Sequence, residues 1–333
     1  MITSLRPTTA FATLLLASCL PAHAAGVADC TAIEADAARL ACYDRIAGRA
    51  ERPPTSAAAE PAAGSGRSLL TENWELDGPS ELFGIRRYKP VYFLPYFHAT
   101  HANPVPYSPT RGSAANYAKS DATEAKFQIS FKTKVLNNLV ADNGDLWLGY
   151  TQSSRWQVYN GDASRPFRET NYEPEAMFVW RTRFDALGMT GRYLGFGINH
   201  QSNGQGGALS RSWNRLTAAV GFDQGPWTLT LRPWWRLPEH GMDDDNPDLA
   251  DYAGRGELLL TRTMGSHVFS LEARHSLRGG DRNHGSLRAD WAFPIDDRLK
   301  GHIQWFSGYA ESLIDYNHRS SYLGLGVSLV EWH

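Results

Sequence analysis

The feature that most constrains the fold is a series of short segments in which apolar and polar residues alternate. From about Leu82 to the C-terminus, runs of roughly ten residues alternate with a period of two. Clusters rich in Gly, Asp, Asn and Pro separate them. Examples are KFQISFKTKV from Lys126, LWLGYTQSSRW from Leu146, YLGFGINH from Tyr193, WTLTLRPWWRL from Trp227, HVFSLEARHSL from His267 and SYLGLGVSLV from Ser321. Because successive side chains of a strand point to opposite faces, each segment is typical of a strand with one apolar face.

The number and length of these segments favour a membrane barrel. About twelve segments follow one another in hairpin order, and an even number of bilayer-crossing strands is what a closed transmembrane β-barrel requires. A soluble sandwich or a lipocalin-like barrel would show similar alternation. Aromatic residues near the segment ends resemble the belts at membrane interfaces and favour the membrane version. The tryptophans concerned are Trp147, Trp180, Trp227, Trp234, Trp291 and Trp305. We therefore predict an all-β protein, a twelve-stranded antiparallel transmembrane β-barrel.

Composition excludes two other classes. The formal net charge is -2, from 33 basic and 35 acidic residues, so there is no basic field to hold a nucleic acid. Mean hydropathy is -0.41, and after the N-terminus no apolar run is long enough to cross a bilayer as a helix. A helical membrane protein is therefore excluded. A β-barrel is not, because strands that alternate between lipid and lumen average out as mildly polar.

The N-terminus predicts secretion. Arg6 precedes an apolar run that ends at Leu20, and Ala22 and Ala24 supply small residues at a cleavage site, so we expect residues 1–24 to be a signal peptide. A lipoprotein signal that ends at Cys19 is the alternative, since Leu16 to Cys19 also fit a lipidation box. Either signal sends the chain out of the cytoplasm and supports the membrane barrel.

Three segments follow the signal peptide. Residues 25–51 have apolar residues at helical spacing and predict a small helical element, clipped by a disulfide between Cys30 and Cys42 in an oxidising compartment. Two free buried thiols are the alternative. Residues 52–68 are rich in Pro, Ala, Gly and Ser and predict a flexible linker. Residues 69–333 form the predicted barrel domain.

One polar stretch, NHQSNGQGGALSRSWNR from Asn199, stands out from this pattern. In the strand before it, His200 and Ser202 share their face with the large apolar residues Phe196 and Ile198. In a transmembrane barrel that face is the outside, against lipid. By the same parity Asn214 points outward in the following strand, and a hairpin can bring it beside His200.

These three residue types suit acyl transfer. A serine hydroxyl becomes a nucleophile when a neighbouring imidazole takes its proton, and a third group must fix the tautomer of that imidazole. Ser202, His200 and Asn214 can fill these roles, with a neutral amide as the orienting group. The backbone amide of Gly204 is our candidate for stabilising the oxyanion. At the membrane rim such a site would meet lipid esters. The alternative is a polar strand end without chemistry.

Several motifs in a conserved order carry a resemblance to a known family. NHQSNG and SRSWNR, preceded by YTQSSRWQ and PFRETNYEPE and followed by DDDNPD and SGYAESLIDYNH, resemble outer-membrane phospholipase A from about Leu82 onward. The resemblance implies a twelve-stranded barrel in the bacterial outer membrane that hydrolyses sn-1 and sn-2 acyl esters of phospholipids and lysophospholipids. It also implies calcium dependence and activity as a homodimer, with Ser202 as nucleophile, His200 as base and Asn214 as orienting residue.

The resemblance extends to a calcium site beside the nucleophile. It implies that the carbonyl of Gln205, the side chain of Ser210 and, from the neighbouring barrel, Ser164 hold Ca²⁺, which supports the oxyanion together with the Gly204 amide. Gln152 matches a polar residue at the dimer interface. One position departs from the pattern, because well-studied family members carry an acidic residue where this chain has Gly207. Fewer charged ligands weaken calcium sites, so we expect weak calcium binding by the monomer.

Two other functions stay open from the sequence. A binding or transport barrel without catalysis would place its functional residues in the lumen, whereas His200, Ser202 and Asn214 are expected to face outward. A lipid A deacylase should carry a different set of motifs. We expect DDDNPD, from Asp243, to be a solvated acidic loop, and Arg211 and Arg215 to point inward and pair with acids such as Glu169 or Glu173.

Overall fold

In the computed structural model the chain forms two compact units, Met1–Ala62 and Ala63–His333. The structure describes residues 30–33, 35–47, 68–77, 81–114, 120–186, 188–239, 241, 244–296 and 299–330. The predicted signal peptide, residues 1–24, lies outside these residues. So does the predicted linker, residues 52–68, except for Ser68, which caps the first helix of the second unit by accepting a hydrogen bond from the Thr71 amide.

The first unit contains the predicted helix and disulfide. Helix α2 spans Asp36–Ile46, and Ala, Leu and Arg residues in it favour helical backbone. Cys30 and Cys42 are joined by a disulfide with a Cα–Cα separation of 5.6 Å, so the alternative of two free thiols is excluded. Among all the described helices, none has the length and apolar character needed to span a membrane.

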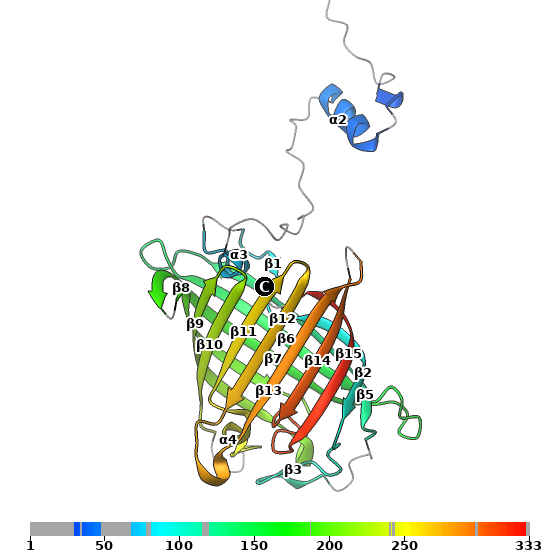
Figure 1. The fold of residues 1–333 in the computed structure, drawn as a ribbon, viewed down its shortest axis with the longest axis vertical. Helices are drawn as coiled ribbons and strands as arrows, with labels where there is room; N and C mark the ends of the chain where they lie inside the picture. Colours follow the sequence, from blue (N-terminus) through cyan, green and yellow to red (C-terminus); the bar gives the residue numbers. More distant parts are fainter. Residues whose placement is uncertain are drawn as a thin grey trace, which may run out of the picture. The chain divides into compact units, whose positions relative to one another are not determined.

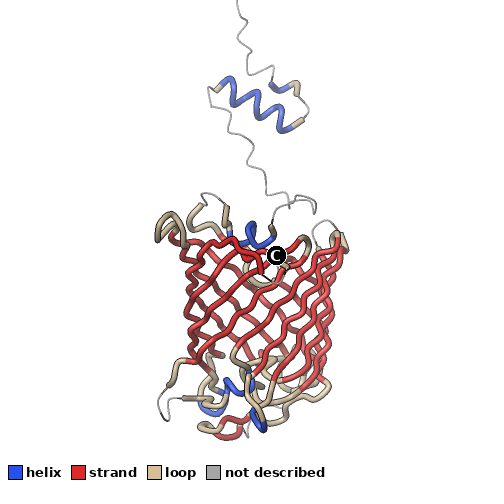
Figure 2. The backbone as a smooth tube through the Cα atoms, turned by 60° about the vertical axis from the view of Figure 1, so that its left-hand side comes forward, coloured by secondary structure: helices blue, strands red, loops and turns tan. Residues whose placement is uncertain are grey.

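The second unit is a closed antiparallel barrel of twelve long strands, as predicted (Figures 1 and 2). The strands are β2 (Val91–Ala99), β5 (Thr123–Leu136), β6 (Asp145–Trp156), β7 (Phe167–Ala186), β8 (Met189–Ser202), β9 (Ser212–Gln224), β10 (Trp227–Arg236), β11 (Gly256–Met264), β12 (His267–His275), β13 (Gly285–Pro294), β14 (Lys300–Gly308) and β15 (Ser320–Val330). Each pairs with the next, and β15 pairs with β2, so the sheet has no free edge among these strands. The short β1 (Ile85–Arg86) adds to β5, and β3 (Tyr107–Ser108) pairs with β4 (Gly112–Ser113).

The two ends of the barrel differ in the length of their connections. At one end β9 and β10 are joined through residues 225–226, and β11 and β12 through residues 265–266. At the other end the connections are longer, and they carry η1 (Gly207–Leu209), α4 (Leu249–Ala253) and η3 (Gly280–Arg282). We call these the short-turn end and the long-loop end. Outer-membrane barrels have short periplasmic turns and longer extracellular loops, so the long-loop end faces the cell exterior.

The alternation of side chains distinguishes a membrane barrel from a soluble one. In β5, Lys126, Gln128 and Lys132 are buried inside the barrel, whereas Ile129 and Phe131 are exposed on its outer surface. A soluble barrel would bury its apolar residues inside. The inverted arrangement excludes the soluble sandwich and the lipocalin-like barrel, because an apolar exterior is stable only against lipid.

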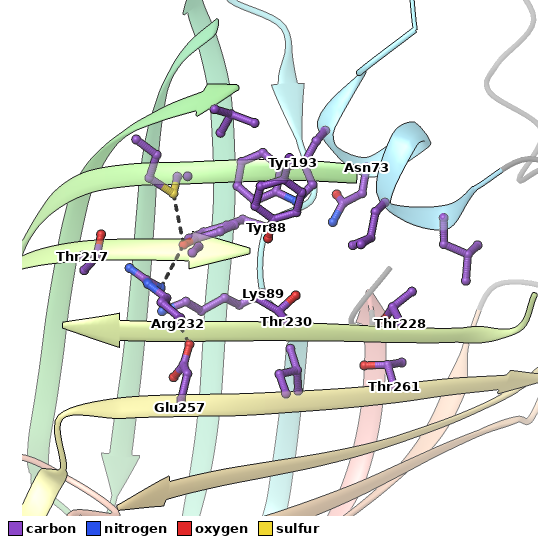
Figure 3. A pocket seen from close by; sticks show the side chains of 18 of the residues that line it. Asn73, Tyr88, Lys89, Tyr193, Thr217, Thr228, Thr230, Arg232, Glu257 and Thr261 are labelled. Carbon is purple, nitrogen blue, oxygen red and sulfur yellow. Dashed lines mark hydrogen bonds and ion pairs between the residues drawn. The ribbon is translucent and has the colours of Figure 1, made fainter. Parts of the chain in front are cut away.

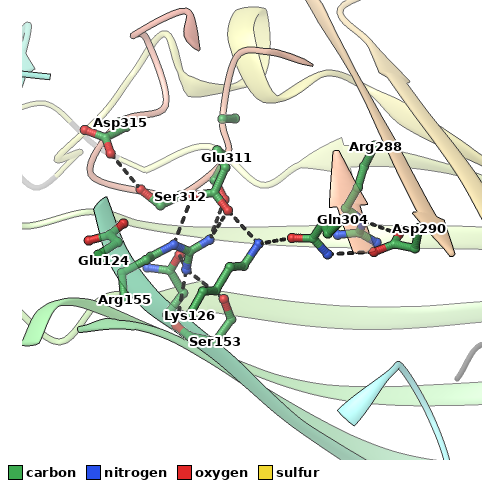
Figure 4. A network of polar contacts seen from close by, with 12 residues as sticks. Glu124, Lys126, Ser153, Arg155, Arg288, Asp290, Gln304, Glu311, Ser312 and Asp315 are labelled. Atoms are coloured by element: carbon green, nitrogen blue, oxygen red, sulfur yellow. Dashed lines mark hydrogen bonds and ion pairs between the residues drawn. The ribbon is translucent and has the colours of Figure 1, made fainter. Parts of the chain in front are cut away.

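The lumen is filled from both ends. At the short-turn end α3 (Leu69–Trp74) packs Leu70 and Trp74 against Trp147 and Tyr193 of the inner wall. Beside α3 a cavity remains, lined by threonines of β9, β10 and β11 and by the Arg232 and Glu257 side chains (Figure 3). At the long-loop end the connection between β14 and β15, residues 309–319, folds inward (Figure 4). There the Glu311 carboxylate accepts from Lys126 and the Ile314 amide donates to Glu169 of the inner wall. Protein segments therefore occupy both ends of the lumen.

Two of the six tryptophans expected in an aromatic belt lie inside the barrel instead. Trp147 and Trp234 are 0% and 4% exposed. Trp147 packs edge-to-face against Trp74 of α3, and Trp234 against Trp213, because these rings fill the ends of the lumen. The other four tryptophans are at least partly exposed, as expected for residues at a membrane interface.

Candidate active site

His200, Ser202 and Asn214 lie on the outer face of the barrel at its long-loop end. His200 and Ser202 are in the last residues of β8, and the β8–β9 register sets His200 directly opposite Asn214. The side chains before them on the same face, Phe196 and Ile198, are 56% and 59% exposed. The intervening Asn199 is 3% exposed and belongs to the interior. The polar cluster therefore borders the lipid-facing surface.

His200 and Asn214 are joined by a hydrogen bond. His200 Nδ1 lies 2.8 Å from Asn214 Oδ1. An amide oxygen can only accept, so Nδ1 carries the proton and Nε2 has a free lone pair, as a general base needs. Within the described part of the chain, the Ser202 hydroxyl forms no hydrogen bond. The structure thus contains the His200–Asn214 contact of the candidate triad. Catalytic hydrogen bonds to a nucleophile are often long or poorly aligned in the absence of substrate.

The structure adds a residue that the sequence analysis missed. The Asn214 Nδ2 group donates to Glu239 Oε1 over 3.2 Å. Glu239 follows β10, where the Leu237 amide donates to the Asn214 carbonyl over 2.8 Å. Burial raises the pKa of the Glu239 carboxyl, and the nearby Arg236 opposes that shift. The described cluster is therefore a chain of polar contacts from the imidazole through the amide to a carboxylate.

The loop between β8 and β9 has a fixed backbone. Gly204 adopts a positive φ of +64°, and a Cβ at this position would lie 3.2 Å from the Tyr172 ring, so glycine is strongly favoured here. Asn203 braces the loop, since its Oδ1 accepts from the amides of Gln205, at 3.2 Å, and Arg211, at 3.0 Å. The candidate oxyanion amide thus lies in a short, internally bonded loop next to Ser202.

Two of the three candidate calcium ligands are in this loop. Gln205 and Ser210 both lie between β8 and β9, and the Ser210 hydroxyl donates to the Asp245 carboxylate. The exposed Ser164 lies in a different connection, between β6 and β7, and has a positive φ of +59°. In the described ranges there is no group of three or more His, Cys, Asp or Glu side chains placed to hold a metal ion. One chain thus brings together only part of the expected ligand set.

The acidic loop DDDNPD is structural rather than solvated, so our expectation was wrong. Asp244, Asp245 and Asn246 are buried. Asn246 bonds through its side chain to both the amide and the carbonyl of Ser212, at 3.0 Å each. Asp244 pairs with Arg236 at 2.6 Å. These contacts form because the loop folds back over the rim of the barrel. Asp243 itself lies outside the described residues.

The two arginines of the motif have different partners. Arg215 points inward and pairs with Glu173 at 3.0 Å, as predicted. Arg211 is also buried, but it donates to the carbonyls of Ala208 and Ser210, at 3.0 and 2.7 Å. Arg211 therefore closes its own loop and does not form the ion pair with an acid that we expected.

Gln152, the candidate interface residue, lies on the outer face of β6. It is paired in register with Ile129 of β5 and Tyr172 of β7, both exposed. Its side-chain oxygen accepts a hydrogen bond from Tyr150 over 3.0 Å. Its side-chain nitrogen donates to Ser154 Oγ over 3.5 Å, so Gln152 is a polar group within an apolar surface that is bonded to neighbours on its own strand.

Several known proteins are similar to this chain. Residues 70–329 match the phospholipase A1 family. A Neisseria meningitidis serogroup B protein provisionally named phospholipase A1 is 36% identical over 346 residues, which cover 90% of this chain and 89% of the relative. The phospholipase A1 of Escherichia coli strain K12 is 37% identical over 215 residues, 65% of this chain and 72% of the relative.

Solved structures show the same fold. Outer membrane phospholipase A from Escherichia coli superposes with a TM-score of 0.67 at 32% identity, covering 77% of this chain and 95% of that protein. The Salmonella typhi outer membrane phospholipase, solved as a dimer with bound calcium, gives a TM-score of 0.68 at 30% identity, covering 79% of this chain and 97% of that protein.

Proposed function

The chain belongs to the phospholipase A1 family and is an outer-membrane hydrolase acting on phospholipids, and from this premise we propose that Ser202, His200 and Asn214 are its catalytic residues. We propose that they cleave both sn-1 and sn-2 acyl esters of phospholipids and lysophospholipids. The observation that supports this most is the His200–Asn214 hydrogen bond of 2.8 Å on the outer wall of the barrel. A base oriented there can only serve substrates that reach it from the membrane.

The chemistry follows from the roles of the three side chains. Ser202 Oγ attacks the ester carbonyl carbon while His200 Nε2 takes its proton. Asn214 holds the imidazole through Nδ1–H, so the imidazolium stays in place and gives the proton to the oxygen of the leaving alcohol. Water, activated by the same imidazole, then hydrolyses the acyl-enzyme and releases the fatty acid. We assign the stabilisation of the negative oxygen to the Gly204 amide, and the hydrogen bond from the Gln205 amide to Asn203 Oδ1 in the same loop supports this role.

Calcium and a second copy of the chain are part of the proposal. The carbonyl of Gln205 and the hydroxyl of Ser210 are oxygen donors of the kind Ca²⁺ takes, and Asp245 adds a carboxylate next to Ser210. Bound there, calcium would supply positive charge near the developing oxyanion. Because one chain offers few ligands, Ser164 of the partner subunit would complete the site. Gln152 would lie in the interface. The Salmonella typhi structure, a dimer with bound calcium, supports a calcium-bound dimer as the active form.

The rival functions fit the structure less well. A transport barrel needs an open lumen, and here α3 and residues 309–319 fill the lumen from opposite ends. The candidate catalytic residues also lie outside it. A lipid A deacylase is disfavoured because the relatives and solved structures described above are phospholipases.

The test is fatty-acid release from phosphatidylcholine in mixed micelles. The refolded protein would be compared with Ser202→Ala, with calcium and with a chelator. Ser321→Ala, which removes an outward serine from a different part of the wall, is the matched control. We expect loss of release in Ser202→Ala and in the chelated sample, and normal release in the control. Hydrolysis that survives Ser202→Ala would refute the proposed nucleophile.

A further inference from the structure

The asparagine of the triad can face the histidine in two ways. An amide side chain carries an acceptor oxygen and a donor nitrogen, and a half-turn exchanges them. With Oδ1 toward His200, the imidazole carries its proton on Nδ1 and its Nε2 can accept from a serine. With Nδ2 toward His200, the proton moves to Nε2 and the base is lost. A catalytic asparagine therefore needs something that fixes its orientation, unlike a catalytic carboxylate.

The hydrogen bond between Asn214 and Glu239 fixes the orientation of the amide. An ionised carboxylate can only accept hydrogen bonds, so it can only face the Asn214 Nδ2 group, which lies 3.2 Å from Glu239 Oε1. The opposite atom of the amide, Oδ1, must then face His200 Nδ1, at 2.8 Å. The orientation that Glu239 imposes is the orientation that catalysis requires.

The surroundings of Glu239 keep its carboxylate available for this contact. The Leu237 amide bonds to the Asn214 carbonyl over 2.8 Å, which ties the backbone two residues before Glu239 to the strand that carries Asn214. Arg236 is engaged by Asp244, at 2.6 Å, and by the Asn246 carbonyl, at 2.8 Å. These contacts place a partly buried carboxylate behind the neutral amide.

We infer that Glu239 is a positioning residue that fixes the amide of Asn214 and provides the negative charge that the Ser202–His200–Asn214 set lacks. The inference rests on the proposed function. The charge matters because His200 becomes an imidazolium during the reaction, and an anion one amide away stabilises it. The charged groups that face Glu239 are Arg236, Asp244 and Asp245, and they stay in place in the test variants.

The first experiment distinguishes the contribution of the hydrogen-bond acceptor of Glu239 from that of its negative charge. Glu239→Ala removes both and Glu239→Gln keeps an acceptor oxygen, and kcat/KM is measured in mixed micelles with calcium from acid to neutral pH. We expect Glu239→Ala to lower kcat/KM by roughly ten- to a hundredfold, the size of a lost hydrogen bond to a charged group, and Glu239→Gln to lower it less. In both, the acid limb of the profile moves to lower pH, because the imidazolium loses a neighbouring anion. Asp251→Asn, which breaks an ion pair in the same connection without touching Asn214, is the control.

The second experiment tests whether the effect of Glu239→Gln on kcat/KM changes direction when Asn214 is replaced by aspartate. In an Asn214→Asp background the Glu239 carboxylate faces a second carboxylate, and the two repel. Glu239→Gln should then raise kcat/KM, whereas in the Asn214 background it lowers it. If Glu239 has a purely structural role, Glu239→Gln will change kcat/KM in the same direction in both backgrounds, and that result would overturn the inference. A wild-type kcat/KM and a wild-type pH profile in Glu239→Ala would overturn it too. Activity that survives Ser202→Ala would instead refute the proposed function, so the two failures are distinguishable.

Discussion

Glu311 should be a major source of stability in the filled lumen, and its removal should destabilise the barrel by about 3 kcal/mol. The residue lies at the start of the β14–β15 connection and its carboxylate accepts from Lys126 Nζ at 2.7 Å and from Arg155 at 2.8 and 3.0 Å (Figure 4). All three side chains are at most 4% exposed. Glu311→Ala would leave two cations buried without their acid.

The size of the expected loss of stability depends on the hydrogen bonds that Lys126 and Arg155 keep in Glu311→Ala. Removing one partner of a buried ion pair costs about 3–5 kcal/mol. Lys126 would retain Gln304, at 2.7 Å, and Arg155 would retain Ser153, also at 2.7 Å, which places the estimate at the lower end of that range. Glu311→Gln keeps the shape and an acceptor, so it should lose less stability than Glu311→Ala.

The same residue predicts a pH dependence. Burial opposes ionisation of Glu311, but Arg155 and Lys126 outweigh it and lower the pKa of the carboxyl to about 2. In the unfolded chain the pKa of a glutamate is about 4.3. A depressed folded pKa gives stability that is complete above the unfolded value and is lost as the pH falls from about 4.3 toward 2. Glu311→Gln should flatten this part of the stability profile.

The assay is urea unfolding of the refolded barrel in detergent, followed by tryptophan fluorescence, at neutral pH and down to pH 3. Asp281→Ala, which removes an exposed acid from the β12–β13 connection, is the matched control. Planar-bilayer conductance gives a second measure, because a loosened connection should admit ions to the lumen. If Glu311→Ala unfolds at the same urea concentration as the control, the reasoning about the buried network is wrong.

Three further predictions concern the site. Asn214→Ala should lower turnover by roughly a hundredfold or more with an unchanged urea midpoint, since His200 loses its orienting partner; normal turnover would remove Asn214 from the triad. Gly207→Asp should tighten calcium binding by the monomer roughly tenfold in calorimetric titration, because it adds a charged oxygen ligand. Space around Gly207 is open, with no atom within 4 Å of a Cβ placed there, and aspartate tolerates its φ of +62° better than most residues; equal affinities would separate this position from the calcium site. Raising detergent until dimers dissociate should abolish hydrolysis, and activity that follows monomer concentration would contradict the role of Ser164.

Strand parity in the sequence was sufficient to assign the inner and outer faces of β5 and β8. Alternation in β5 predicts that Lys126 and Lys132 face the lumen and Phe131 faces lipid, and the structure agrees. Parity alone also places His200 and Ser202 on the outer face, because a strand has only two faces and the apolar one is known. These predictions need no information from distant parts of the chain.

Features that depend on connections could not be predicted in the same way. Trp147 packs against Trp74 of α3, which is far away in the sequence, and Asp245 is buried because its loop folds back to Ser210. The local sequence around a residue does not show which distant segment will pack against it. Glu239 is intermediate, since the register that pairs Arg236 with Arg215 could have been counted outward from the two-residue turn at residues 225–226. When this register is continued for three residues beyond Arg236, Glu239 falls on the same outer face of the sheet as Asn214.

The filled interior and the external site are connected through the strands that carry both. Asn199 and Arg215, the sequence neighbours of His200 and Asn214, point inward, and both bond to Glu173 Oε1, at 2.9 and 3.0 Å. The inward neighbours of both outward side chains are thus anchored to one partly buried carboxylate on the inner wall. A hydrogen bond between side chains on adjacent strands stays short only if the strands cannot slide or splay. The charged lumen, which has no transport role in this proposal, therefore serves to hold the outer site rigid at the surface of the membrane.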